Sequence, residues 1–117
     1  MIQLATIEEI ERFMSQLLPH AIKAPWADHP VSSQVLADIC LEKGIVLPKL
    51  HPSYYNNSRQ VRHYLDHLLN RIFANGAEYV SGTIMMRKDR LLVGNTAGSM
   101  LPKTFYSFKT VKKRRVK

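Results

Sequence analysis

The hydrophobic periodicity of the chain changes once, at Gly76. Before this residue, apolar side chains recur every three or four positions in three separate stretches, which is the spacing of an α-helix with one buried face. After it, residues 78–86 (EYVSGTIMM) are rich in strand-forming residue types. A run of helices followed by strands predicts a single α+β domain, and 117 residues are enough for one ordinary hydrophobic core.

The first helix is predicted to begin at Thr6. Thr6 and Glu9 have the spacing of a capping box, in which each side chain accepts a hydrogen bond from the other residue's amide. Apolar residues follow at helical spacing as far as Leu18. Pro19 predicts that the helix ends near Leu18, and the proline-containing residues 20–30 are interpreted as a loop.

Two further helices are marked at their ends. Ser32 is a good N-cap for the second, and Gly44 stands where a left-handed C-cap belongs. Residues 45–57 are a turn-rich connection that could hold a short strand or an extra turn of helix. Ser58 is interpreted as the cap of the third helix, which is expected to end at residues 75–76. This helix is amphipathic, with a polar face that is basic near its N-terminus.

The last third of the chain is interpreted as a β-hairpin and a tail. Residues 78–86 form its first strand, the polar run 87–90 (RKDR) its turn, and residues 91–93 its return strand. Residues 94–103 are expected to be loop-like, and residues 103–111 to hold one short strand. Residues 112–117 (KKRRVK) are too polar to pack and are expected to form a flexible basic tail. These boundaries give a domain at 1–103 and a basic C-terminal extension at 104–117.

The charge of the chain is uneven. Its net charge is +8, but residues 1–57 hold four Lys/Arg against six Asp/Glu, whereas residues 58–117 hold thirteen against three. The two parts therefore carry −2 and +10. Positive charge gathered in one half creates a field that attracts a polyanion, most commonly nucleic acid. An anionic membrane surface or an acidic protein remains an alternative on charge alone.

Compartment is predicted from what the sequence lacks. No segment has the roughly 18 apolar residues needed to cross a bilayer. The first residues lack the basic region of a signal peptide, and the single cysteine, Cys40, cannot form an intramolecular disulfide. These features predict a cytoplasmic protein that does not bind membranes.

Three segments carry a resemblance to a known superfamily: VSSQVLADICLEKGI, SRQVRHYLDHLLNRIF and EYVSGTIMMRKDRLLVGN. In this order, over roughly residues 5–95, they resemble the scaffold helix, recognition helix and wing of winged helix-turn-helix DNA-binding proteins. The chain departs from that pattern in its long, proline-containing connection at residues 45–57. The resemblance implies a three-helix core followed by a hairpin wing, with the third helix in the major groove of duplex DNA.

The resemblance also implies DNA-binding residues in three groups. On the third helix, Arg59 and Arg62 would pair with guanine and Gln60 with adenine, with His63 beside them. At the wing tip and in the tail, phosphate or minor-groove contacts would come from Arg87, Lys88, Arg90, Lys109, Lys112, Lys113, Arg114 and Arg115. Together these predict a transcriptional regulator of bacterial, plasmid or phage type, which a homodimer would give a doubled footprint.

The sequence favours no catalytic, metal or cofactor site. His63 and His67 are four residues apart and could meet on one helix face, but no third metal ligand is placed by spacing. Cys40 lies on an apolar helical stripe and is interpreted as a core residue. The protein is therefore predicted not to be an enzyme. A protein-binding adaptor or inhibitor on the same scaffold, and an RNA binder using the basic tail and aromatic residues, remain the alternatives.

Overall fold

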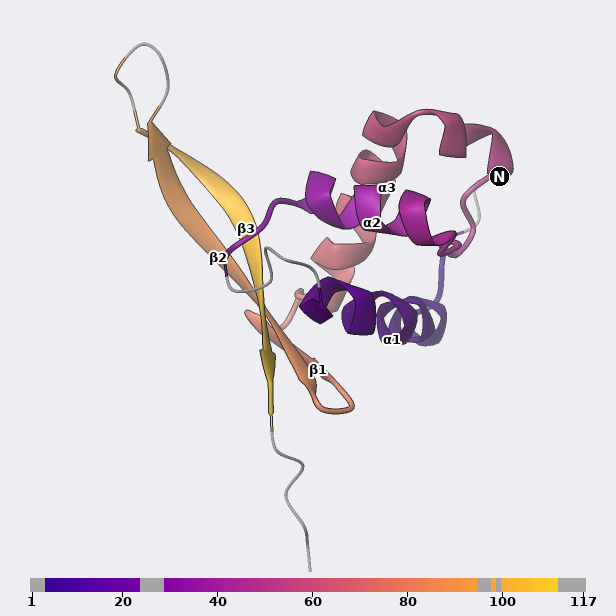
Figure 1. Ribbon diagram of the computed structural model, residues 1–117, viewed down its shortest axis with the longest axis horizontal. Coiled ribbons are helices and arrows are strands. Elements are labelled where there is room, and N and C mark those ends of the chain that lie inside the picture. The colour runs from indigo at the N-terminus through magenta and orange to yellow at the C-terminus, as the bar shows by residue number, and fades with distance from the viewer. Residues whose placement is uncertain (1–3, 24–28, 95–97, 99, 112–117) are drawn as a thin grey trace, which may run out of the picture.

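The computed structural model describes residues 4–23, 29–94, 98 and 100–111. Three helices, α1 (Ile7–Lys23), α2 (Ser33–Lys43) and α3 (Ser58–Ile72), precede three strands, β1 (Glu78–Ser81), β2 (Ile84–Gly94) and β3 (Met100–Thr110) (Figure 1). A short 3₁₀ helix, η1 (Pro52–Asn56), lies between α2 and α3. The strands form one antiparallel sheet in the order β1-β2-β3. The α+β class is confirmed, and the layout is compatible with a winged helix.

The first helix starts where the sequence predicts and ends later. The Thr6 amide donates to Glu9 Oε1 at 2.9 Å, and the Glu9 amide donates to Thr6 Oγ1 at 3.1 Å, which confirms the capping box. The predicted end near Leu18 is wrong, because α1 continues through Pro19 to Lys23. Leu18 and Ala21, on either side of the proline, are both buried. Their packing favours the extra turn despite the hydrogen bond that proline cannot donate.

The caps of α2 and α3 follow local backbone chemistry. Gly44 caps α2 with a φ of 67°, the left-handed conformation that glycine adopts without strain. Ser32 is the N-cap of α2, but its side chain makes no capping hydrogen bond. The cap of α3 is Asn57 and not Ser58, since Asn57 Oδ1 accepts from the amides of Arg59 and Gln60. The third helix ends at Ile72, before the predicted end at residues 75–76.

The sheet departs most from the sequence prediction. The first hairpin turns at residues 82–83, where Ser81 pairs with Ile84 and Gly82 has a φ of 62°. Glycine with positive φ suits such a two-residue turn. The polar run 87–90 is therefore not a turn but the middle of β2, and the predicted basic wing tip is wrong. The longer hairpin pairs β2 with β3 from Ile84–Thr110 to Gly94–Met100.

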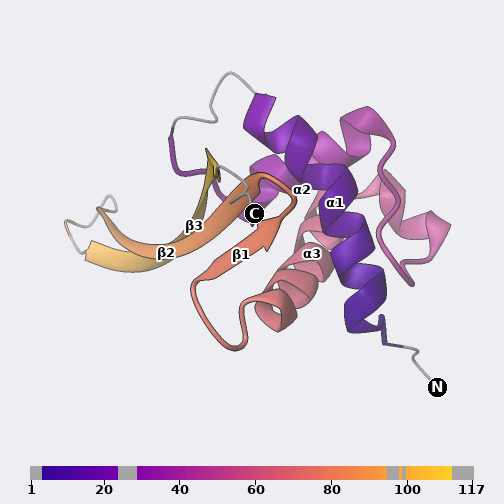
Figure 2. The ribbon, with the colours of Figure 1, turned by 90° about the horizontal axis from the view of Figure 1, so that it is seen from below.

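The core lies between the three helices and the near end of the sheet. Met86 of β2 is fully buried there, and Tyr106 of β3 packs on Phe73 with ring centroids 5.8 Å apart. Val31, between α1 and α2, forms an antiparallel bridge with Tyr106. This bridge attaches the start of α2 to β3, while the far end of the hairpin projects beyond the helices (Figures 1 and 2).

The predicted boundary at residue 103 falls inside a strand. Strand β3 runs across residue 103, so residues 104–110 belong to the sheet and not to an extension. Residues 112–117, the predicted basic tail, lie outside the described residues. None of the helices in the described part of the chain combines the length and apolarity needed to cross a membrane.

Candidate nucleic-acid interface

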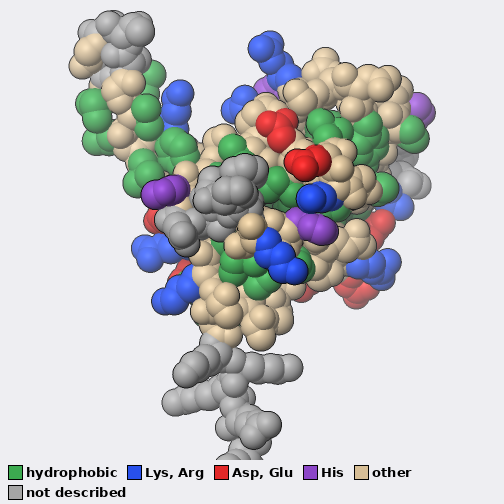
Figure 3. Space-filling model, in the orientation of Figure 1, with side chains coloured by type: hydrophobic (Ala, Val, Ile, Leu, Met, Phe, Trp, Pro, Cys, Tyr) green, Lys and Arg blue, Asp and Glu red, His purple; other side chains and the backbone are tan. Residues whose placement is uncertain are grey.

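A groove of about 560 Å³ separates the helices from the projecting hairpin. Its walls come from three elements that are distant in sequence. They are the start of α2 (Ser32, Ser33, Gln34), one face of α3 (Arg62, Asp66, Asn70) and the edge strand β3 (Lys103, Thr104, Phe105, Tyr106). Figure 3 shows the hollow between hairpin and helices, with Lys and Arg side chains on both flanks. The lining is largely polar, so the groove suits a charged or hydrogen-bonding ligand.

Arg62 stands at the junction of α2 and α3. Its Nε lies 3.4 Å from Ser33 Oγ and 3.7 Å from a carboxylate oxygen of Asp66, one helical turn further on. The side chains of Arg62 and Asp66 remain 43% and 35% exposed. An ion pair this exposed is weak and screened by salt. The guanidinium is therefore oriented by its neighbours but remains accessible to an anion entering the groove.

Asn70 and Lys88 join the other end of this helix face to the sheet. Lys88 Nζ donates to Asn70 Oδ1 at 3.2 Å, which places the middle of β2 against α3. Successive side chains of a strand point to opposite sides of the sheet, which tells on which side of β2 each neighbouring cation lies. Lys88 and Arg90 share the helix-facing side of β2 with buried Met86, whereas Arg87 lies on the opposite side, 3.3 Å from Asp89. Only part of the predicted wing group is thus directed towards the helices.

The structure adds a cation of the edge strand, Lys103, to the lining of this groove, and places Arg90 on the neighbouring strand. Arg90, which is exposed, is the register partner of Thr104 and shares the helix-facing side of β2 with Met86 and Lys88, but the groove lining does not include it. Lys103, also exposed, lines the groove itself. The sequence predicts Lys103 at the junction of a loop (94–103) and a short strand (103–111), without a role in binding. Its register partner is Leu91, which lies on the outer side of the sheet, so Lys103 reaches the groove because β3 is the edge strand and not because it faces the helices.

The start of α3 presents the remaining predicted helix residues. Arg59, Gln60 and His63 are exposed, and Arg59 lies three residues before Arg62, on the same helical face. Lys109, in contrast, pairs with Met85 on the outer side of the sheet, away from the groove. The predicted tail residues Lys112, Lys113, Arg114 and Arg115 lie outside the described residues.

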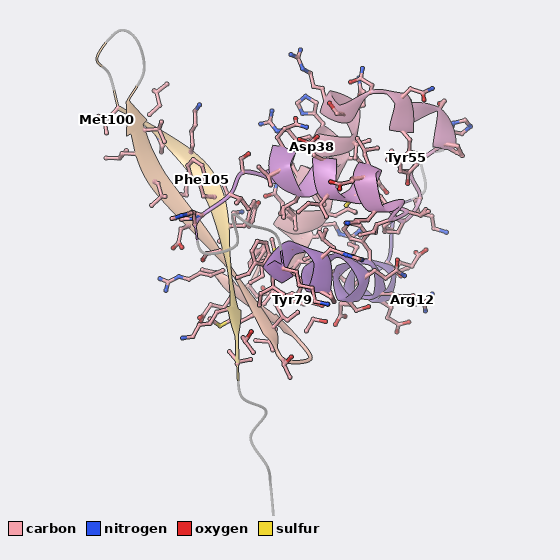
Figure 4. All side chains as sticks on the ribbon, viewed as in Figure 1. Arg12, Asp38, Tyr55, Tyr79, Met100 and Phe105 are labelled. Carbon is pink, nitrogen blue, oxygen red and sulfur yellow. The ribbon has the colours of Figure 1, made fainter. Side chains whose placement is uncertain are left out.

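The connection at residues 45–57 does not cover this face. Its η1 helix is the extra helical turn left open by the sequence. Tyr55 Oη accepts from the Leu47 amide at 2.8 Å, and Tyr64 Oη donates to the Pro48 carbonyl, so both tyrosines hold the connection to the body. Figure 4 places Tyr55 on the side of the helices remote from Phe105 and the hairpin. Arg59 and Gln60 therefore remain open to solvent.

Two aromatic residues of β3, Phe105 and Tyr106, also line the groove. Burial, and secondly the nearby Asp66 charge, raise the pKa of Tyr106 to about 12. The phenol is thus neutral at physiological pH and serves as packing, as does the half-buried Phe105 beside it. Elsewhere, burial raises the pKa of the Cys40 thiol to about 12, so it is not the thiolate that a nucleophile requires.

The two histidines of α3 are the pair that the sequence offers as possible metal ligands. His63 and His67 are both exposed and lie one helical turn apart. Within the described residues, no three His, Cys, Asp or Glu side chains lie close enough together to hold a metal ion.

A comparison with protein-family models, with curated proteins and with solved structures finds no match. The function is therefore inferred from the geometry and chemistry of the groove.

Proposed function

We propose that the chain binds duplex DNA through the groove and the exposed start of α3, as a transcriptional regulator of bacterial, plasmid or phage type. The observation that carries this proposal is the pairing of cations across the groove. Arg62 stands on the helical wall, with Arg59 one turn before it, and Lys103 stands on the hairpin wall, with Arg90 on the neighbouring strand. Positive charge on two facing walls attracts a phosphate backbone more strongly than the same charges spread over a surface.

The exposed start of α3 supplies the groups that read bases. An α-helix fits the major groove of B-form DNA, and arginine and glutamine pair there with guanine and adenine. Arg59 and Gln60 are exposed at the first turn of α3, and Asn57 fixes that turn by capping it. Phosphate contacts then come from Arg62 and Lys103 within the groove. The hairpin contributes through cations along its length and not through a basic tip.

Fluorescence anisotropy on the purified full chain tests the proposal. Random duplex, single-stranded DNA and structured RNA are titrated at two salt concentrations, with wild type and Arg59→Ala plus Arg62→Ala. The matched control is Arg12→Ala plus Lys43→Ala, which removes the same charge from exposed positions outside the groove lining. Wild type is expected to prefer duplex, and the α3 variant to bind at least about tenfold more weakly, because two base or phosphate contacts are lost.

Each other outcome of this experiment contradicts the proposal. Equal weakening by the control pair would mean that net charge alone drives binding. Preference for single strands or RNA would favour the RNA-binding alternative. Absence of binding to any nucleic acid at low salt would favour the adaptor role, for which the exposed apolar residues of the β2–β3 hairpin are the supporting observation.

A further inference from the structure

The projecting end of the β2–β3 hairpin is exposed and apolar. We call residues 91–94 and 100–102 the arm. Leu92 and Met100 are 65% and 56% exposed on its helix-facing side, and Leu91 and Leu101 are 41% and 48% exposed on the other side. Figure 4 places Met100 near the end of the arm, clear of the helices. Apolar side chains thus face solvent on both sides of a two-stranded ribbon.

The backbone of the arm is also unprotected. Strand β1 pairs with β2 only at Ile84–Arg87, and Val31 meets β3 only at Tyr106. Beyond these positions, no described residue pairs with the outer edge of either arm strand. Isolated two-stranded ribbons are marginally stable in water, and exposed apolar strand edges invite pairing with another chain. The arm therefore has the properties of an unpartnered interface.

Charge separates the arm from the rest of the surface. Residues 91–102 contain no Asp, Glu, Lys, Arg or His, although the chain as a whole carries a net charge of +8. A segment without cations has no electrostatic attraction for phosphates. The absence of charge instead favours contact with a second copy of this chain. Two copies repel each other through their basic surfaces, and that repulsion is weakest where the contact itself is uncharged.

We infer that the arm is a self-association surface, on which the arm of a second copy packs. The exposed parts of Leu91, Leu92, Met100 and Leu101 together amount to roughly 400 Å², divided between the two faces of the ribbon. Both faces together supply about half of the roughly 800 Å² per partner in a standard interface, and the open strand edges supply further contact area. A two-fold contact lets the same patch serve both partners. The expected dimer is reversible.

This inference does not depend on nucleic-acid binding, because it is tested without nucleic acid. Sedimentation velocity on the full chain, from micromolar to near-millimolar concentration, is expected to show a shift from the 13.5 kDa monomer towards twice that mass. Raising the salt concentration is expected to strengthen the dimer, since salt screens the repulsion between basic chains and leaves apolar contacts intact. Binding to DNA has the opposite salt dependence.

Variants locate the contact. Replacing Leu91, Leu92, Met100 and Leu101 together by threonine keeps strand-favouring residues while removing apolar area. This variant is expected to raise the dimer dissociation constant by at least about tenfold. The control is Val46→Thr, at a position 70% exposed but outside the arm, and it is expected to leave the constant unchanged. Circular dichroism establishes that each variant is folded, and Leu92→Thr alone replaces the fourfold variant should that one fail.

Three results would overturn the inference. The first is a wild type that stays monomeric over the whole concentration range. The second is a folded arm variant that dimerises as tightly as wild type. The third is a monomeric chain whose arm variant loses binding to anionic lipid vesicles, which would assign the arm to a membrane surface. A failure of DNA binding, with the dimer intact, would contradict the proposed function and leave this inference standing.

Discussion

Replacing Asp66 by asparagine is expected to tighten DNA binding. The Asp66 carboxylate lines the groove, repels phosphates and lies 3.7 Å from Arg62 Nε. Asparagine has nearly the same shape, so the substitution removes the charge without opening a cavity. A single acidic group among the cations of a binding groove should oppose the ligand, and its removal should help.

The size of the effect follows from distance and exposure. Two unit charges 3.7 Å apart attract by about 1 kcal/mol in water, and exposed pairs measured in proteins contribute roughly 0–1 kcal/mol. Releasing Arg62 from this pair should therefore improve binding by about 0.5–1 kcal/mol, or roughly two- to fivefold. If the released charge then meets a phosphate, the salt dependence should steepen by up to about 0.9 in log–log slope.

Anisotropy with duplex DNA between about 50 and 200 mM salt measures both quantities. A second readout needs no DNA: because the Asp66 charge contributes to the raised pKa of Tyr106, Asp66→Asn should lower that pKa in a near-ultraviolet titration. Lowered Tyr106 pKa with unchanged or weakened DNA binding would refute the reasoning, since the groove would then be formed as described but not be occupied by phosphate.

Three further predictions concern the fold. Gly44→Ala should destabilise the protein by about 1–2 kcal/mol in urea unfolding, because its φ of 67° is strained for a side chain, whereas Gly76→Ala, with no positive φ and open space around it, should be neutral or slightly stabilising. Asn57→Ala should cost about 1 kcal/mol and Ser58→Ala much less; the reverse order would mean that the cap of α3 is assigned wrongly. Hydrogen bonding to Thr6 lowers the pKa of Glu9, so its contribution to stability is present above the usual carboxyl range and lost as pH falls through the lowered pKa. Thermal unfolding of Glu9→Gln should accordingly depend less on acid pH than that of wild type.

Local chemistry made the helix ends predictable where a single side chain determines them. The Thr6–Glu9 capping box and the Gly44 cap depend on residues within one turn, so the sequence alone specifies them. Pro19 led to a wrong prediction of the end of α1, because the free-energy cost of a proline inside a helix is outweighed by the burial of Leu18 and Ala21. That burial arises only when the helices pack together. Asn57 was overlooked as a cap because the serine that follows it is an equally good capping residue.

Residue types alone placed the turn of the hairpin at the wrong residues. A polar run such as residues 87–90 is typical of a turn, yet a strand whose two faces meet different surroundings accommodates it. Arg87 pairs with Asp89 on one face and Lys88 bonds to Asn70 on the other. The turn was instead specified by Gly82, which the sequence analysis did not assign to a turn. Because β2 continues through residues 87–90 to Gly94, the projecting end of the longer hairpin carries the uncharged arm instead of the charged run.

The sequence predicted the helical part of the candidate site but not the part on the hairpin. Arg59, Gln60 and Arg62 lie on one helix, so amphipathic spacing predicts their shared polar face. Lys103 lines the groove only because β3 pairs with β2 and forms the sheet edge beside the helices, a long-range arrangement that no local pattern specifies.

Mapping the bound surface by NMR tests the central claim most directly. Amide chemical shifts of the full chain are followed during titration with a short duplex at low salt. We predict perturbations at the start of α3, at Ser32–Gln34 and at Lys103–Tyr106, with the outer side of the sheet around Lys109 unaffected. Perturbations confined to that outer side, or spread evenly over all basic residues, would contradict the groove as the DNA-binding site.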